Sequence, residues 1–255
     1  MKKLLYLFTA SLLAFTSCSK DDNDSSDPAS SILVKKITMV ASDGDSSTEN
    51  YLYNGNKIVS MTEADGSVTK YTYTGDLITK IEELDVTGTL NLTTNYNYVS
   101  GRLDNSIRKH SAESYYYKTI YIYNADGTVS YDNFRGVAST GVEQEYGATG
   151  KFTFKEGNVV KLEVSYYGND RSYVYEYDTK NNPFKNVTGL SLLLDDDTAV
   201  NNIVKKTAIS GSGANITTII TTYSYKYNAN NYPTEKVETF SNGNSTFTET
   251  TQYSY

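Results

Sequence analysis

Tyrosines and aliphatic residues alternate with polar residues along most of the chain, with a period of two. In residues 71–81, Tyr71 and Tyr73 are separated by one threonine, Gly75 follows, and a leucine and two isoleucines come after the glycine. Alternate side chains of a strand point to the same face, so the two tyrosines share one face, and the glycine marks a turn. The stretch therefore predicts a β-hairpin.

Variants of this hairpin recur over residues 51–255. Asn54-Gly55 is expected to form a two-residue turn, and Asp65-Gly66 and Asp126-Gly127 mark further turns, because these residues tolerate positive φ. Turns about ten residues apart predict strands of about six to nine residues that pair with their sequence neighbours. The chain is therefore expected to be all-β, with one repeat-built domain over residues 32–255. A long antiparallel meander of about 15 strands tends to curl or close into a barrel-like sheet.

One segment near residues 183–200 interrupts the alternation. It contains a cluster of leucines, which predicts a short helix opened by Pro183 or a loop that packs against the sheet or plugs it. Asp195, Asp196 and Asp197 would lie in the loop that follows. They lack the ligand spacing and central glycine of a calcium loop, so they are a weak metal candidate, and a solvated acidic loop is the simpler interpretation.

The start of the chain has a different pattern. Two lysines, an apolar run too short to span a bilayer, and small residues before Cys18 predict a lipoprotein signal peptide over residues 1–17. Lipidation of Cys18 would anchor the protein to a membrane without crossing it. The alternative is an ordinary signal peptide with an incidental cysteine. Residues 18–31 are rich in Asp and Ser and predict a disordered acidic tether, which also resembles the surface-export signal of Bacteroidota lipoproteins.

Composition narrows the function. The formal net charge is −7, and an acidic surface disfavours nucleic acid as a partner. Cys18 is the single cysteine, so the predicted β domain contains no disulfide, cysteine metal site or catalytic thiol. Strands such as residues 80–83 and 155–163 carry charges where lipid would require an apolar band, so we do not expect a membrane-spanning barrel.

Tyrosine accounts for 25 of the 255 residues. Paired tyrosines stacked across a meander form either an aromatic binding platform or a core lining whose hydroxyls reach solvent or the backbone. Repetition in every unit favours the core lining. The candidate binding aromatics are Tyr71, Tyr73, Tyr121, Tyr123, Tyr173, Tyr175, Tyr223 and Tyr225.

Catalytic chemistry has little support in the sequence. His110 is the only histidine and stands in a basic stretch beside an expected turn, which is typical of a surface residue. Acidic residues are scattered over alternating strands, and their spacing does not show the separation that paired-carboxylate hydrolysis needs. We therefore expect no enzyme and no cofactor.

Two segments carry a family resemblance. Tyr177-Asp178 with Asn182-Pro183-Phe184-Lys185, and the stretch over residues 227–234, resemble a family of Bacteroidota lipoproteins of unknown function with a porin-like fold. The tyrosine-glycine units also resemble the YD repeats of RHS-type proteins. The resemblance implies a curled or closed antiparallel meander outside the cell, and it implies no known activity.

The leading hypothesis is an outer-membrane lipoprotein, facing the cell exterior, that acts as a monomeric, non-catalytic binding module for a glycan or a protein partner. Exposure to the periplasm is the alternative location. A structural or assembly role in the cell envelope is the second hypothesis, and a carboxylate-based hydrolase is the third.

Overall fold

The computed structural model describes residues 31–194, 198–211, 216–241 and 246–255. The predicted signal peptide, Cys18 and nearly all of the tether lie outside the described residues, as do Asp195, Asp196 and Asp197.

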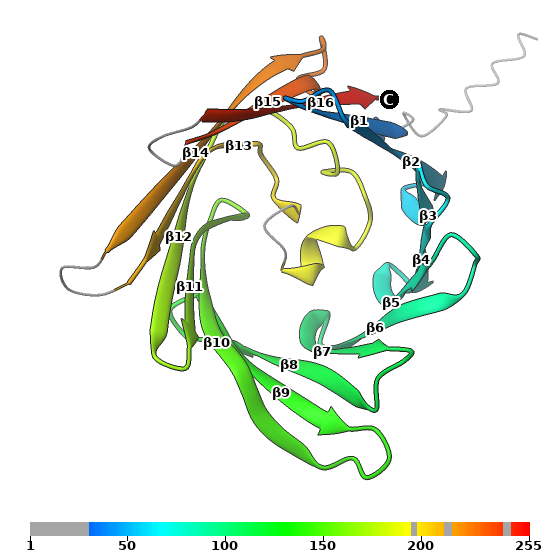
Figure 1. Cartoon of the computed structure of the whole chain (residues 1–255), viewed down its shortest axis with the longest axis vertical. Helices are drawn as coiled ribbons and strands as arrows, with labels where there is room; N and C mark the ends of the chain where they lie inside the picture. Colours follow the sequence, from blue (N-terminus) through cyan, green and yellow to red (C-terminus); the bar gives the residue numbers. More distant parts are fainter. Residues whose placement is uncertain (1–30, 195–197, 212–215, 242–245) are drawn as a thin grey trace, which may run out of the picture. The chain divides into compact units, whose positions relative to one another are not determined.

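Within this described part, sixteen antiparallel strands form one sheet that closes into a barrel (Figure 1). Each strand pairs with its sequence neighbours, and β1 pairs with β16 from Lys36 opposite Ser254 to Ala41 opposite Glu249. The predicted all-β antiparallel meander is confirmed, with sixteen strands instead of about 15, and of the two expected forms, curled or closed, the sheet is closed. The strands are β1 (Lys36–Ala41), β2 (Ser46–Asn54), β3 (Lys57–Glu63), β4 (Val68–Thr74), β5 (Leu77–Leu84), β6 (Leu90–Val99), β7 (Arg102–His110), β8 (Tyr115–Tyr123), β9 (Val129–Val137), β10 (Glu143–Lys155), β11 (Asn158–Tyr166), β12 (Asn169–Tyr177), β13 (Ile203–Ser210), β14 (Thr217–Tyr227), β15 (Pro233–Ser241) and β16 (Thr246–Ser254).

The segment between β12 and β13, residues 178–202, is the predicted insertion. It lies inside the ring of strands and contains a 3₁₀ helix, η1 (Leu190–Leu193), drawn in yellow in Figure 1. The helix follows Gly189, which has φ 76°, so the prediction that Pro183 opens a helix is wrong. The chain after Pro183 forms turns instead. None of the helical segments in the described part of the chain has the length and apolar character that a membrane crossing requires.

Backbone hydrogen bonds hold the insertion at one end of the barrel, which we call the insertion end. The Thr188 amide donates to the Asn56 carbonyl over 2.9 Å, and the Asn181 amide donates to the Asn231 carbonyl over 3.0 Å. Both acceptors lie in hairpin turns at that end. The opposite end of the barrel, where β1 meets β2 and β11 meets β12, is called the open end.

A β-bulge recurs just before the turn in six of the strand pairs at the insertion end. In the first of them, Leu52 pairs with Ser60 and Tyr53 pairs with Ile58, so the return strand carries one extra residue. The bulges follow Leu52, Thr72, Asn97, Thr153, Glu176 and Lys226. Because a bulge bends the strand and increases its twist, the repeated bulges help the sheet to curl into a barrel.

The bulge also shifts the first turn by one residue from its predicted place. Asn54 pairs with Lys57, so the loop consists of Gly55 and Asn56 instead of Asn54-Gly55. Gly55 takes φ 58° at the first loop position, where some two-residue hairpin turns require glycine.

An aliphatic residue follows each of several insertion-end turns and points inward. Ile58, Ile78, Leu103, Val129 and Val159 are all buried. They form a core at the insertion end, and this explains why a Leu, Ile or Val recurs after the glycine in the sequence.

The outward face of the strands carries ion pairs, together with exposed aliphatic side chains such as Leu52 and Ile122. Phe152 and Leu162 pair across β10 and β11 and face inward, so their neighbours Lys151 and Glu163 face outward, where their charged groups lie 3.3 Å apart. Glu163 also accepts from Lys161 over 2.8 Å. The barrel exterior therefore presents charge where a lipid-facing barrel is apolar.

Candidate functional site

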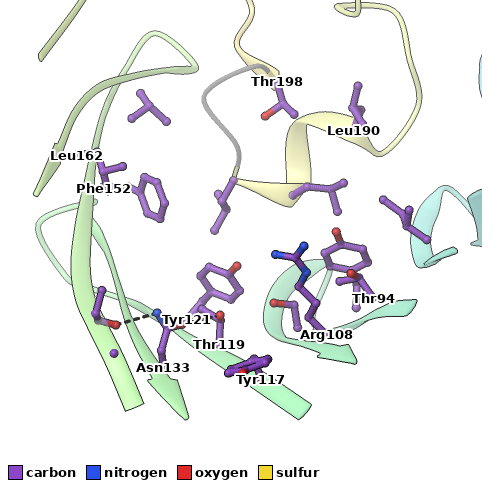
Figure 2. A pocket seen from close by; sticks show the side chains of 18 of the residues that line it. Thr94, Arg108, Tyr117, Thr119, Tyr121, Asn133, Phe152, Leu162, Leu190 and Thr198 are labelled. Carbon is purple, nitrogen blue, oxygen red and sulfur yellow. Dashed lines mark hydrogen bonds between the residues drawn. The ribbon is translucent and has the colours of Figure 1, made fainter. Parts of the chain in front are cut away.

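A cavity of about 1010 Å³ lies inside the barrel (Figure 2). Strands β2 to β12 and the insertion line it, so the cavity occupies one side of the lumen. Tyr166, which lines the cavity at the open end, is 48% exposed, whereas Ile58 and Val159, which line it at the insertion end, are buried. The insertion therefore forms a floor, and the open end is the mouth.

The floor is apolar. Phe152 and Val159 belong to a buried cluster, and Leu162 and Leu194 pack against that cluster. Leu190 and Leu193 of η1 also line the cavity, where both side chains are half-buried.

The middle of the cavity is lined by short polar side chains. The Thr119 hydroxyl donates to Asn133 Oδ1 over 2.7 Å, and Asn133 Nδ2 donates to the Ala148 carbonyl over 2.8 Å. These bonds fix the orientation of the Asn133 amide, which Figure 2 shows on the cavity wall. Thr94 and Ser106 contribute further hydroxyls.

The charged groups of the lining, Glu83 and Arg108, lie toward the mouth, and His110 lines the same region. Figure 2 shows Arg108 reaching from its strand into the cavity. Tyr117 pairs with Arg108 across β7 and β8, and its ring packs against Tyr146 with centroids 5.6 Å apart.

The eight candidate tyrosines do not form one surface. Tyr71, Tyr121 and Tyr175 line the cavity. Tyr173 lies under the ammonium group of Lys206, 5.3 Å from its ring centroid. The remaining candidates, Tyr73, Tyr123, Tyr223 and Tyr225, are absent from the cavity lining formed by the described residues.

Several tyrosines of the repeat have a structural role instead. The Tyr225 hydroxyl donates to the Ile203 carbonyl over 2.8 Å, just beyond the point where the β13–β14 ladder ends at Lys205. Tyr53, Tyr98, Tyr177 and Tyr255 make equivalent bonds to the carbonyls of Val34, Ile78, Val159 and Pro233. Each hydroxyl donates to a backbone carbonyl that lies beyond the end of the neighbouring strand ladder. These tyrosines therefore act as core-lining residues whose hydroxyls bind the backbone.

Tyr51 and Tyr71 of the cavity lining remain protonated at neutral pH. Burial raises the pKa of Tyr71 to about 12. Burial, with a smaller contribution from the hydrogen bond to Glu49, raises the pKa of Tyr51 well above its ordinary value. The phenol groups of Tyr51 and Tyr71 are therefore neutral hydrogen-bonding groups with flat apolar faces.

No model of a known protein family matches the sequence, and no curated protein matches it either. A crystal structure of a porin-like protein from Bacteroides uniformis matches the fold with a TM-score of 0.54. The two chains share 14% sequence identity, and the match covers 87% of this chain and 97% of the other. The chain has a porin-like fold. The fold part of the predicted resemblance is therefore confirmed.

Sequence reasoning missed two residues of the porin-like barrel's cavity. Arg108 was not singled out, and His110 was interpreted as a surface residue, yet both line the mouth. The available signal was their spacing of two, which places both on one face of β7 with Ser106. The sequence did not show which face of β7 is the inner one.

The described part of the porin-like barrel has few side chains that could bind a metal ion or act as a general acid or base. The described residues contain no group of three or more His, Cys, Asp or Glu side chains that could hold a metal ion. Among the described residues that line the cavity, Glu83 is the only carboxylate. The described lining thus lacks the pair of carboxylates that glycoside hydrolysis uses.

Proposed function

We propose that this porin-like barrel is an outer-membrane-associated binding protein that holds a glycan in its lumen without catalysing a reaction. The supporting observation is the cavity of about 1010 Å³, which is closed by the insertion and lined by tyrosines and short polar side chains. Its volume is at the upper end of the about 300–1,000 Å³ typical of small-molecule sites.

The chemistry of the lining favours a sugar. Tyr71 and Tyr121 offer aromatic rings to the apolar C–H faces of a pyranose, while Thr119 and Asn133 offer groups that pair with its hydroxyls. A cavity with a single mouth suits a short oligosaccharide or the end of a chain better than it suits a folded protein partner.

The ion pairs on the barrel exterior support attachment to a membrane by lipid instead of insertion of the barrel. We propose that Cys18 carries that lipid and that the barrel faces the cell exterior. The closed sheet leaves no unpaired edge among the described strands, which supports a monomer. In an assembly role, other envelope proteins would contact the outer face of the barrel, and the aromatic lining of the lumen would have no function.

A glycan-array screen of the full-length protein tests this function, followed by calorimetry with the best ligand. Tyr71→Leu removes an aromatic face from the cavity and should weaken binding about tenfold, a loss of about 1.4 kcal/mol. Phe247→Leu is the matched control, because Phe247 is 51% exposed and is absent from the described cavity lining. Absence of binding to any glycan, or equal binding by both variants, would overturn the proposal.

A further inference from the structure

We infer that the glycan is acidic and that the guanidinium group of Arg108 holds its negatively charged group. This inference rests on the proposed lumenal glycan site and adds the chemical class of the ligand. The anionic group is a carboxylate, as in a uronic acid, or a sulfate ester, since both present oxygens that a guanidinium can bind in a bidentate manner.

Several cationic side chains have a partner in the structure, and Arg108 differs from them. Lys118 and Lys205 bind carboxylates on the outer face, at 3.1 and 2.7 Å, and Arg102 lies over the ring of Tyr123. The guanidinium group of Arg108 makes no ion pair, hydrogen bond or aromatic stacking contact with any residue of the described part of the chain. It is exposed within the lumen, so its five donors are available to a ligand.

A second cation reinforces the positive charge of this wall. Tyr117 pairs with Arg108 on one side and with Arg135 on the other. Because neighbouring strands lie about 4.8 Å apart, the backbones of the two arginines are separated by about 10 Å, with Tyr117 between them. The Arg135 guanidinium lies 4.9 Å from the ring centroid of Tyr115 and 5.0 Å from that of Tyr146, which holds it in place.

The opposite charge in the lining lies on another strand. Glu83 pairs with Leu92, and Leu92 pairs with His110, so Glu83 lies two strands away from His110. Glu83 makes no ion pair with Arg108, whose cationic group is thus not neutralised from within the lining. The wall formed by β7 to β9 is positive and the wall at β5 is negative, which orients an acidic sugar with its anionic group toward Arg108.

The position of Arg108 inside the lumen contrasts with the negative net charge of the protein. The chain carries a formal charge of −7, and a general attraction of anions to its surface is not expected. A guanidinium without a partner among the described residues, on the wall of a cavity whose described lining holds one carboxylate, Glu83, instead provides selectivity for an anion inside the lumen. An aromatic ring beside the cation, supplied by Tyr117, provides a face for the sugar that carries it.

The test compares acidic oligosaccharides with their neutralised forms on full-length protein, by calorimetry. The panel contains uronic acid oligosaccharides with their methyl esters, and sulfated oligosaccharides with their desulfated forms. The ligand that binds should lose tenfold or more in affinity when its acidic group is removed. Whether the carboxylate or the sulfate pair shows this loss identifies the anionic group.

Variants of Arg108 test whether this loss of affinity depends on its guanidinium group. Arg108→Gln should reduce binding of the acidic form tenfold or more and leave binding of the neutral form unchanged. The affinity of Arg108→Lys for the acidic form should lie between those of the wild-type protein and Arg108→Gln, since lysine keeps the positive charge and loses the bidentate geometry of the guanidinium. Glu83→Gln should strengthen binding of the acidic form. Arg102→Gln is the matched control, because Arg102 lies on the same strand at the insertion end, and thermal melting checks that each variant is folded.

The outcomes separate the two proposals. Equal binding of acidic and neutral forms, or binding of neutral forms alone, overturns the inference about charge and leaves the glycan site in place. Undiminished binding of the acidic form by a folded Arg108→Gln variant overturns the role of Arg108. Binding of no member of the panel overturns both proposals.

Discussion

The hydroxyl of Tyr98 donates a hydrogen bond over 2.8 Å to the carbonyl of Ile78, a residue whose side chain is fully buried. The ladder between β5 and β6 ends at Lys80 opposite Asn95, so no strand partner reaches the Ile78 carbonyl from β6. The tyrosine thus takes the place of a backbone donor next to a bulge. Tyr177 and Val159 show the same relationship at 2.7 Å.

Removing this hydroxyl should destabilise the barrel. Tyr98→Phe and Tyr177→Phe each leave a carbonyl without a donor, and each should lower the free energy of unfolding by about 1–3 kcal/mol. Urea unfolding followed by circular dichroism measures the change. Tyr167→Phe is the control, since Tyr167 is exposed and its hydroxyl makes no hydrogen bond within the described residues. A loss no larger than the control would show that these hydroxyls do not stabilise the fold.

Two strand glycines should differ in their tolerance of alanine. A Cβ at Gly150 would lie 2.5 Å from the ring of Tyr131 and 2.6 Å from the carbonyl oxygen of Glu163, which is backbone and cannot move aside. The three atoms nearest to a Cβ at Gly136 all belong to the side chain of Tyr116. Gly150→Ala should therefore cost about 1–3 kcal/mol of stability.

A double-mutant experiment tests this explanation, because the aromatic ring of Tyr116 can be removed by mutation. Gly136→Ala should also destabilise the protein, and combining it with Tyr116→Ala should cost less than the sum of the two single changes, as a double-mutant cycle in urea unfolding measures. Additive costs would contradict the steric explanation. Gly150→Ala combined with Tyr131→Ala should recover less, because the contact with the Glu163 carbonyl remains.

The insertion depends on a buried asparagine. Asn202 is 2% exposed, and its Nδ2 donates to Asp178 Oδ2 over 3.2 Å and to the Asn181 carbonyl over 3.1 Å. Asn202→Ala removes both donors and should lower the free energy of unfolding by about 1–3 kcal/mol. Limited proteolysis should cut residues 178–202 faster in this variant. Asn230→Ala is the control at an exposed turn position, and equal cleavage of the two variants would contradict the prediction.

The protein should lose stability at alkaline pH. Burial raises the pKa of both Tyr71 and Tyr98 to about 12, above the ordinary value of 10.0. Between these values the unfolded chain releases protons that the folded chain retains, so the free energy of unfolding decreases as pH rises. The stabilisation is fully present below pH 10.0 and is lost as pH rises through about 12.

Tyrosinate absorbance measures this effect during alkaline titration of the folded and the urea-unfolded protein. The folded protein should show a group of tyrosines that ionises later than those of the unfolded chain, and its ionisation should coincide with loss of circular dichroism. Coincident titration curves for the two states would show that burial does not shift these pKa values.

Local sequence patterns predicted much of the fold. The period-two alternation identified the strands, and the glycine turns identified the meander, because strand and turn preferences act over a few residues. The leucine cluster identified the insertion. The turn at Gly55 was misplaced by one residue, since the bulge that displaces it is set by pairing with β3.

The functional site was less accessible to sequence reasoning. Alternation assigns Arg108 and His110 to one face of a strand, but either face of a strand can be the inner one until the sheet curves. Tyr71 and Tyr73 share a face, yet Tyr71 lines the cavity and the hydroxyl of Tyr73 donates to the Thr188 carbonyl of the insertion over 3.2 Å. Their different roles follow from their depth along the barrel.

The sequence by itself determined an antiparallel meander of tyrosine-rich hairpins with one leucine-rich interruption, because these features depend on contacts between near neighbours. Only the tertiary structure decided that β1 closes on β16, that the insertion enters the lumen, and that Arg108 projects into the cavity. Closure joins residues at opposite ends of the described chain, such as Lys36 and Ser254. Pairing at that separation depends on the summed curvature of sixteen strands, which no local pattern contains.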